Sequence, residues 1–103
     1  MRDSFISTLE RLAEKNENIF LLSPDMGFSV FERFREKFPD RFINTGIAEA
    51  NTIGIAAGLA LTNKIVFVYS IVPFVTMRCL EQIRMDVCYQ DLNVKLVGVG
   101  GGL

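Results

Sequence analysis

Apolar stretches typical of buried β-strands alternate along this chain with stretches of helical periodicity. The expected strands are Ile19–Leu22, Phe42–Asn44, Lys64–Tyr69 and Val94–Val99. The expected helices are Asp3–Lys15, Ser29–Phe38, Ala48–Leu61 and Phe74–Tyr89. Strands that alternate with helices are joined by right-handed crossovers and lie parallel, and strands that are apolar on both faces are covered by helices on both sides. The pattern therefore predicts one α/β unit with three αβα layers and a mostly parallel sheet.

Three of the expected helices are amphipathic, and each predicts a set of buried side chains. In the first helix these are Phe5, Ile6, Leu9, Leu12 and Ala13; in the second, Val30, Phe31, Phe34 and Phe38; in the last, Phe74, Met77, Leu80, Ile83 and Val87. The polar side of the last helix carries Arg78, Glu81, Gln82 and Arg84. We expect that side to be a solvated face or a subunit contact, in which Glu81 and Arg84 could pair.

The composition excludes several classes of function. The chain has 103 residues, of which 50% are hydrophobic, and its net charge is −1. Basic and acidic residues are interspersed, so the sequence has no basic stripe of the kind that binds nucleic acid. No apolar run is long enough to span a membrane, and the start does not resemble a signal peptide, so we expect a cytosolic protein. Histidine is absent, which excludes histidine metal sites and Ser-His triads. Cys79 and Cys88 would lie on opposite sides of one helix, so we expect both to be unpaired.

The segment from Phe42 to Ala60 reads as a strand, a glycine turn and a helix of small residues. Glu49 lies in the first turn of that helix, and the small residues Gly46, Ala50, Gly54 and Gly58 recur every four positions along one face. Glycine costs a helix interior about 1 kcal/mol relative to alanine, so another backbone or a flat ligand is expected to approach this face closely. The alternative is ordinary tight packing, with Glu49 placed to favour the helix dipole.

These residues carry a family resemblance. The run from Pro39 to Glu49, followed by Gly54 to Ala60, resembles the pyrimidine-binding domain of the transketolase family, and the likeness extends from Arg2 to about Gly102. The downstream stretch from Ser70 to Gly102 is more similar to split transketolase-like subunits than to 1-deoxyxylulose-5-phosphate synthase. The resemblance implies the thiamine diphosphate-binding fold, with residues 1–103 as the N-terminal part of the domain. Because the family's domain continues beyond this point, we expect the fold to be incomplete at the C-terminus.

The resemblance implies a thiamine diphosphate-dependent transferase of carbohydrate metabolism that moves a ketol unit between sugars. In the family, the glutamate that matches Glu49 hydrogen-bonds N1′ of the aminopyrimidine and favours the tautomer that removes the proton from thiazolium C2. A synthase of the deoxyxylulose phosphate kind is an alternative within enzymes. A non-catalytic interaction module, or a fragment that is inactive by itself, is the alternative from another class.

Further site residues follow from the resemblance. The family stacks aromatic side chains around the pyrimidine at positions that correspond to Ile71, Phe74 and Met77; only Phe74 is aromatic here, and Phe74 and Met77 could instead be ordinary helix core. Asp25 matches an aspartate that faces the cofactor across a subunit interface, and its alternative is to cap the next helix.

The substrate side of the site departs from the family. Arg2 and Ser29 match positions that bind the sugar phosphate, with a frayed terminus and a helix N-cap as alternatives. The family's histidine after the last strand corresponds to Gly100 in this chain. This loss favours a modified or nucleotide-linked sugar over an ordinary phosphorylated pentose.

The resemblance also implies a partner. The family binds Mg²⁺ or Ca²⁺ and the diphosphate through a Gly-Asp-Gly…Asn motif in a separate domain, and that motif is absent from this chain. We therefore expect no metal ligands in this chain and a homo- or hetero-oligomer in which a partner chain or domain holds the Mg²⁺ and the diphosphate. The helix that starts at Glu49 is the expected interface element.

Overall fold

The computed structural model describes residues 1–26 and 29–102, and a four-stranded parallel sheet lies at its centre. The strands are β1 (Ile19–Ser23), β2 (Phe42–Asn44), β3 (Ile65–Ile71) and β4 (Val94–Val99). Their order in the sheet is β2-β1-β3-β4, so β1 and β3 are central. The four predicted strands and their parallel arrangement are confirmed. Gly27, which the sequence places between the first predicted strand and the second predicted helix, lies outside the described residues.

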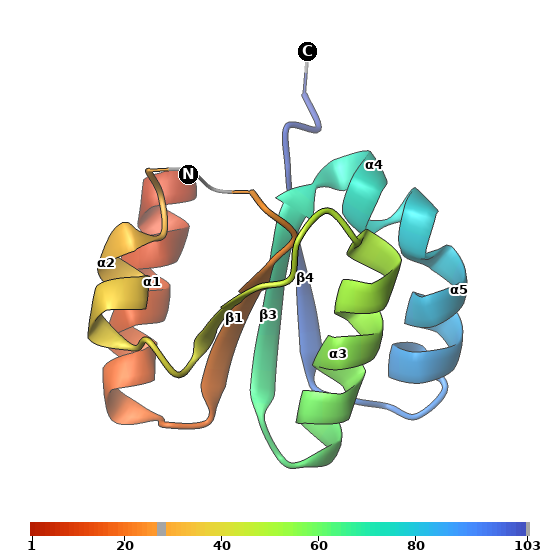
Figure 1. Ribbon diagram of the computed structural model, residues 1–103, viewed down its shortest axis with the longest axis horizontal. Coiled ribbons are helices and arrows are strands. Elements are labelled where there is room, and N and C mark those ends of the chain that lie inside the picture. The colour runs from red at the N-terminus through yellow and green to blue at the C-terminus, as the bar shows by residue number, and fades with distance from the viewer. Residues whose placement is uncertain (27–28, 103) are drawn as a thin grey trace.

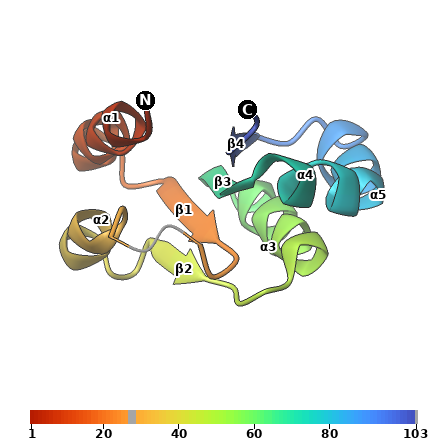
Figure 2. The ribbon, with the colours of Figure 1, turned by 90° about the horizontal axis from the view of Figure 1, so that it is seen from above.

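Helices cover both faces of this sheet, which confirms the predicted three layers (Figures 1 and 2). The helices α1 (Arg2–Lys15) and α2 (Glu32–Lys37) lie on one side. The helices α3 (Glu49–Leu61), α4 (Val72–Val75) and α5 (Leu80–Gln82) lie on the other. Consecutive residues of a strand point to opposite faces, so Leu21 packs in the α1 and α2 layer while Leu22 packs under α3.

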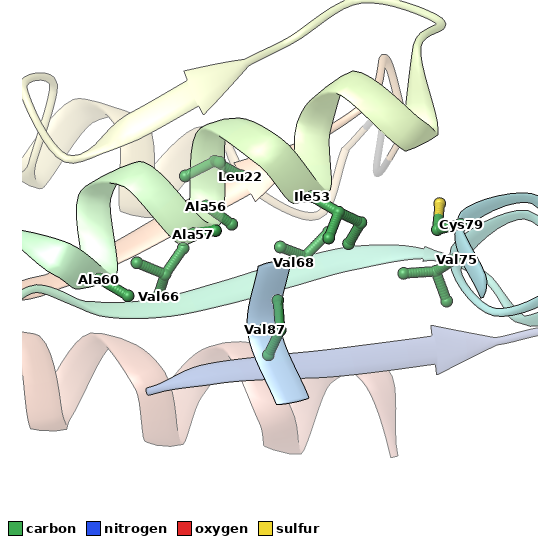
Figure 3. Close-up of a cluster of buried hydrophobic side chains, with 10 residues drawn as sticks. All are labelled: Leu22, Ile53, Ala56, Ala57, Ala60, Val66, Val68, Val75, Cys79 and Val87. Carbon is green, nitrogen blue, oxygen red and sulfur yellow. The ribbon is translucent and has the colours of Figure 1, made fainter. Parts of the chain in front are cut away.

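The core under α3 holds the start of that helix against the sheet. Ile53, Ala56, Ala57 and Ala60 of α3 pack on strand side chains that include Leu22 (Figure 3). Three of these four helix residues are alanines, so α3 lies close to β1 and β3. The packing fixes the position of Glu49, which is the first residue of this helix.

The predicted helix Phe74–Tyr89 is wrong as a single element. The chain instead forms α4, a 3₁₀ turn at Met77–Cys79, α5 and a π-helical segment at Ile83–Cys88. The backbone departs from a regular helix at Thr76 (φ −108°, ψ −70°), and the thiol of Cys79 donates to the carbonyl of Phe74 (3.2 Å), which the backbone N–H of Arg78 would bond in a regular helix.

These breaks rotate the buried face of the segment. Val75 and Cys79 are buried, whereas Met77 and Leu80, both predicted to be core, are 78% and 68% exposed. Ile83 and Val87 pack in the core as predicted. Leu12 of α1 was likewise expected inside and is 46% exposed.

The second helix is shorter than predicted and begins at Glu32 rather than Ser29. Ser29 has a left-handed backbone with φ +64°, which a helix cannot include. Its expected core residues are nevertheless confirmed, since Phe31 and Phe34 are buried and Val30 and Phe38 pack against them.

No helix among residues 1–26 and 29–102 is long and apolar enough to cross a membrane. The same residues contain no group of three or more acidic or cysteine side chains arranged to hold a metal ion.

The two cysteines are unpaired, as predicted, and differ in exposure. Burial, and secondarily the charge of Glu49, raise the pKa of the buried Cys79 thiol, whereas Cys88 is exposed. Since the thiolate is the reactive form, we expect one fast-reacting thiol at pH 8 and one that reacts only on unfolding. Titration with a chromogenic disulfide reagent measures this, and Cys88→Ser should remove the fast phase. A fast phase that survives in Cys88→Ser would contradict the buried position of Cys79.

Candidate functional site

Glu49 lies at the carboxyl edge of the sheet, where parallel α/β sheets usually bind ligands. After β2 the chain turns at Gly46, whose φ of +77° favours glycine, and α3 begins two residues after Ile47. The hydroxyl of Thr52 donates to the carbonyl of Ala48 (2.8 Å) and lies 2.6 Å from the Thr45 hydroxyl. The turn is thereby tied to the first turn of α3, as a fixed Glu49 position requires.

The small-residue face of α3 is open. Gly54 and Gly58 are exposed, and a Cβ added at either would meet nothing within 4 Å. The prediction that Gly46 shares this face is wrong, because Gly46 lies in the turn before the helix. The close neighbour expected at this face is thus not part of the described chain.

The Glu49 carboxylate is buried and meets an arginine. Its side chain is 9% exposed, and its Oε1 accepts a hydrogen bond from Nη1 of Arg78 at 3.2 Å. The Arg78 guanidinium also lies over the Phe74 ring, with its central carbon 3.8 Å from the ring centroid. Glu49 and Phe74 therefore contact one and the same guanidinium.

Arg78 is a residue that sequence reasoning missed, because it was expected on a helix face that is either solvated or a subunit contact. The helical period assigned to residues 74–89 does not hold across Thr76, where the backbone leaves regular helix. A charged residue four positions after the expected aromatic was the available signal, since cations stack on aromatic faces. Of the other residues on that expected face, Glu81 and Arg84 form no ion pair in the described part of the chain.

Ile71 and Met77 differ in exposure. Ile71 is the half-buried last residue of β3, directly before α4, which contains the half-buried Phe74. Met77 is largely exposed, so the alternative that Met77 is helix core is wrong. The hydroxyl of Ser70, next to Ile71, is buried and has no hydrogen-bond partner among the described residues.

Asp25 is fixed by a second residue that the sequence analysis missed, Asn44. The Asn44 Oδ1 accepts hydrogen bonds from the backbone N–H groups of Asp25 (3.0 Å) and Gly46 (2.9 Å), and its Nδ2 donates to Asp25 Oδ1 (3.2 Å). One side chain thus joins the Asp25 loop to the turn that leads to Glu49. Asp25 does not cap the next helix, whose N-cap is Phe31, so that alternative is wrong.

The two expected phosphate-binding residues lie in different settings. Arg2 is exposed at the start of α1 and lines a hollow of about 550 Å³ with Tyr69, Gly98 and Gly100. Burial raises the pKa of Tyr69, and the charge of Arg2 acts against that rise. Ser29 is not part of this hollow; its backbone N–H donates to the Glu32 carboxylate at 2.7 Å. Since α2 begins at Glu32, the alternative that Ser29 is an N-cap is wrong.

A matched pair of glycine substitutions tests the packing around the site. A Cβ on Gly98 of β4 would lie 2.9 Å from Cγ2 and 3.4 Å from Cα of Val72, so we expect Gly98→Ala to lower the free energy of unfolding by about 1–3 kcal/mol. Gly54→Ala fills open space in a helix interior and should raise it by about 0.5–1 kcal/mol. Urea unfolding measures both, and shifts of the same sign would contradict this arrangement.

Comparison with known proteins places the chain in a family. The family model described as the transketolase pyrimidine-binding domain matches residues 1–103. A 6-deoxy-6-sulfo-D-fructose transketolase subunit from Clostridium sp. (strain MSTE9) is 41% identical over 100% of this chain and 32% of its own length. A 1-deoxy-D-xylulose-5-phosphate synthase from Shouchella clausii (strain KSM-K16) is 37% identical over 96% of this chain and 16% of its own.

Among solved structures, a chain titled split gene transketolase, inactive beta4 tetramer, matches with a TM-score of 0.86 and 39% identity. The match covers 94% of this chain and 33% of that one, so the chain spans about a third of the length of its split-subunit relatives. The family model over residues 1–103 and the structural match over 94% of the chain both confirm the predicted resemblance. The protein therefore belongs to the transketolase pyrimidine-binding domain family.

Proposed function

We propose that residues 1–103 are the N-terminal part of the pyrimidine-binding domain of a thiamine diphosphate-dependent transketolase-like enzyme, which transfers a ketol unit between sugars. The observation that carries the proposal is the buried Glu49 carboxylate beside the Phe74 ring at the carboxyl edge of the sheet. Membership of the family and the split-subunit relatives support it.

The residues present fit the aminopyrimidine of this cofactor. Glu49 and Phe74 already contact one planar nitrogen group, the Arg78 guanidinium, and an aminopyrimidine likewise offers a flat ring to Phe74 and a ring nitrogen, N1′, to the Glu49 carboxyl. When bound, thiamine diphosphate supplies a carbanion equivalent and an electron sink. The proposed role of Glu49 is to hold a proton at N1′ of the pyrimidine. Phe74 would stack on the ring, with Ile71 and Met77 as apolar wall and Asp25 facing the cofactor.

A partner is part of this proposal. The diphosphate motif is absent from the chain, so a second chain or domain would hold the diphosphate and Mg²⁺. The open face at Gly54 and Gly58 is where we propose that the partner's backbone approaches α3. The tetramer named for the structural neighbour supports an oligomer here. We also propose a cytosolic location, because free cysteines such as the two in this chain are typical of a reducing compartment.

The proposed substrate is a sugar with an anionic end. Arg2 supplies the positive charge of the hollow beside Gly98 and Gly100, and Ser29 is a second proposed contact. With glycine at position 100 in place of histidine, an ordinary phosphorylated pentose is disfavoured. The relative named for 6-deoxy-6-sulfo-D-fructose supports an anionic group other than phosphate. Efficient turnover of xylulose 5-phosphate by the complete enzyme would contradict this choice.

The test of the proposed function is deuterium exchange at thiazolium C2. The complete subunit is mixed with the polypeptide that carries the diphosphate half, Mg²⁺ and cofactor, and the exchange rate is compared with that of free cofactor. Faster exchange supports the enzyme. Exchange no faster than in free cofactor would indicate the non-catalytic module. Formation of 1-deoxy-D-xylulose 5-phosphate, in place of ketol transfer, would favour the synthase alternative that the Shouchella relative represents.

A further inference from the structure

Arg78 makes two contacts with the residues assigned to the pyrimidine. Its Nη1 lies 3.2 Å from Glu49 Oε1, and its guanidinium lies 3.8 Å from the Phe74 ring centroid. The mechanism proposed above assigns Arg78 no role.

The contact with Arg78 stabilises the Glu49 carboxylate in the protein without cofactor. A carboxylate whose side chain is 9% exposed is poorly solvated and is costly to leave without a partner. Within residues 1–26 and 29–102, Arg78 supplies the one side-chain hydrogen bond and the one ion pair that Glu49 receives. The aromatic face of Phe74 is covered by the same group. One flat cation thus satisfies both partners.

These are also the two interactions that an aminopyrimidine would make. Both groups are planar and stack on an aromatic ring, and both bring a nitrogen to the Glu49 carboxyl, the guanidinium as an N–H donor and the pyrimidine through N1′, which shares a proton with that carboxyl. A carboxylate and a ring that are engaged with the guanidinium are not free to take a second planar group in the same place. The geometry therefore sets Arg78 and the pyrimidine in competition for Glu49 and Phe74.

We propose that Arg78 is a displaceable occupant of the pyrimidine site, which holds Glu49 and Phe74 until the cofactor takes them over. The inference rests on the proposed function, since it takes these two residues as the pyrimidine contacts. Arg78 then determines cofactor affinity, because binding must first break its two contacts.

The local structure allows this exchange through a side-chain movement alone. The side chain of Arg78 is 54% exposed, so its head can turn into solvent. The neighbouring Val75 and Cys79 are buried and anchor the backbone, and the Cys79 thiol donates to the Phe74 carbonyl. Phe74 can therefore stay in place while Arg78 leaves.

The experiment is calorimetric titration of thiamine diphosphate, with Mg²⁺, into the complete subunit assembled with its diphosphate-binding partner. Arg78→Met keeps an unbranched apolar stem and removes the planar cation. We expect its Kd for thiamine diphosphate to be about tenfold lower than that of the wild type. Arg78→Lys keeps the charge without the planar fork and should fall between the two. Arg84→Met is the matched control, because Arg84 is an exposed arginine nearby with no ion pair in the described chain, and its Kd should not change.

Thermal stability gives a second readout, which does not depend on catalytic turnover. Loss of the Arg78 contact leaves Glu49 unpaired, so Arg78→Met should lower the Tm of the cofactor-free assembly. At saturating thiamine diphosphate the difference from the wild type should shrink or reverse, because the tighter binding adds to stability. A merely structural Arg78 would lower Tm by the same amount with and without cofactor.

The outcomes separate the two proposals. If Glu49→Gln weakens binding while Arg78→Met leaves the Kd unchanged or raises it, Arg78 stays in place as a support for Glu49; the inference is overturned and the proposed function stands. If the wild-type assembly has no measurable affinity for thiamine diphosphate, both are overturned. A lower Kd in Arg78→Met with an unchanged Kd in Arg84→Met supports the displaceable occupant.

Discussion

Glu49→Gln is expected to lower the rate of deuterium exchange at thiazolium C2 by about 10²–10⁴-fold in the complete subunit assembled with its partner, Mg²⁺ and cofactor. Glutamine has nearly the same shape and can still accept a hydrogen bond from Arg78 through its carbonyl oxygen. It cannot hold and return a proton as a carboxyl group does. The substitution therefore removes the proposed proton transfer and leaves the packing at the start of α3.

Glu36→Gln is the matched control for this experiment. Glu36 is an exposed residue of α2, on the other side of the sheet from Glu49, and its substitution makes the same chemical change. Its exchange rate should equal that of the wild type. If Glu49→Gln exchanges as fast as Glu36→Gln, Glu49 is not the proton-holding group, and its position at the N-terminus of α3 serves only the helix dipole.

Leu22→Ala is expected to lower the free energy of unfolding by about 2–5 kcal/mol. Leu22 is fully buried in β1 and packs in the core cluster that holds Ile53, Ala56 and Ala57 of α3. Alanine leaves a cavity between the sheet and the helix that begins with Glu49, and alanine side chains on α3 are too short to fill it. Urea unfolding of the complete subunit, followed by circular dichroism, measures the change.

Leu61→Ala makes the same substitution at the last residue of α3, where the side chain is 60% exposed. Its effect should stay within about 0.5 kcal/mol, as is usual for surface substitutions. Because both variants replace leucine with alanine, the difference between their free energies of unfolding measures the effect of burial. Equal losses at both positions would mean that the interior under α3 is not packed as described.

Periodicity predicted best the strands of the sheet and the helix that packs on it. The strands Phe42–Asn44 and Val94–Val99 have the predicted bounds, and α3 begins one residue after its predicted start. A buried strand or a helix on a sheet must repeat apolar residues at its own period, so the sequence alone carries this information. The glycine turn before Glu49 was also predictable, because it depends on residues that are adjacent in the sequence.

The segment from Val72 to Cys88 shows where this reasoning stops. Periodicity assumes one helical repeat, but the backbone departs from it at Thr76, and the thiol of Cys79 bonds to the carbonyl of Phe74. Which side chains then turn inward depends on the packing against α3 and β4. Met77 and Leu80 are exposed for that reason, and Arg78 reaches Glu49, which lies 29 positions earlier.

The sequence by itself determined the α/β class, the parallel sheet, the family and the position of Glu49 in a first helical turn, because each depends on local periods or on a contiguous motif. Only the tertiary structure decided what surrounds Glu49. The Arg78 contact and the Asn44 bonds that join the Asp25 loop to the Gly46 turn connect residues distant in sequence. Such contacts form because strands packed in the order β2-β1-β3-β4 bring their carboxyl ends to one edge, and no spacing along the chain encodes that arrangement.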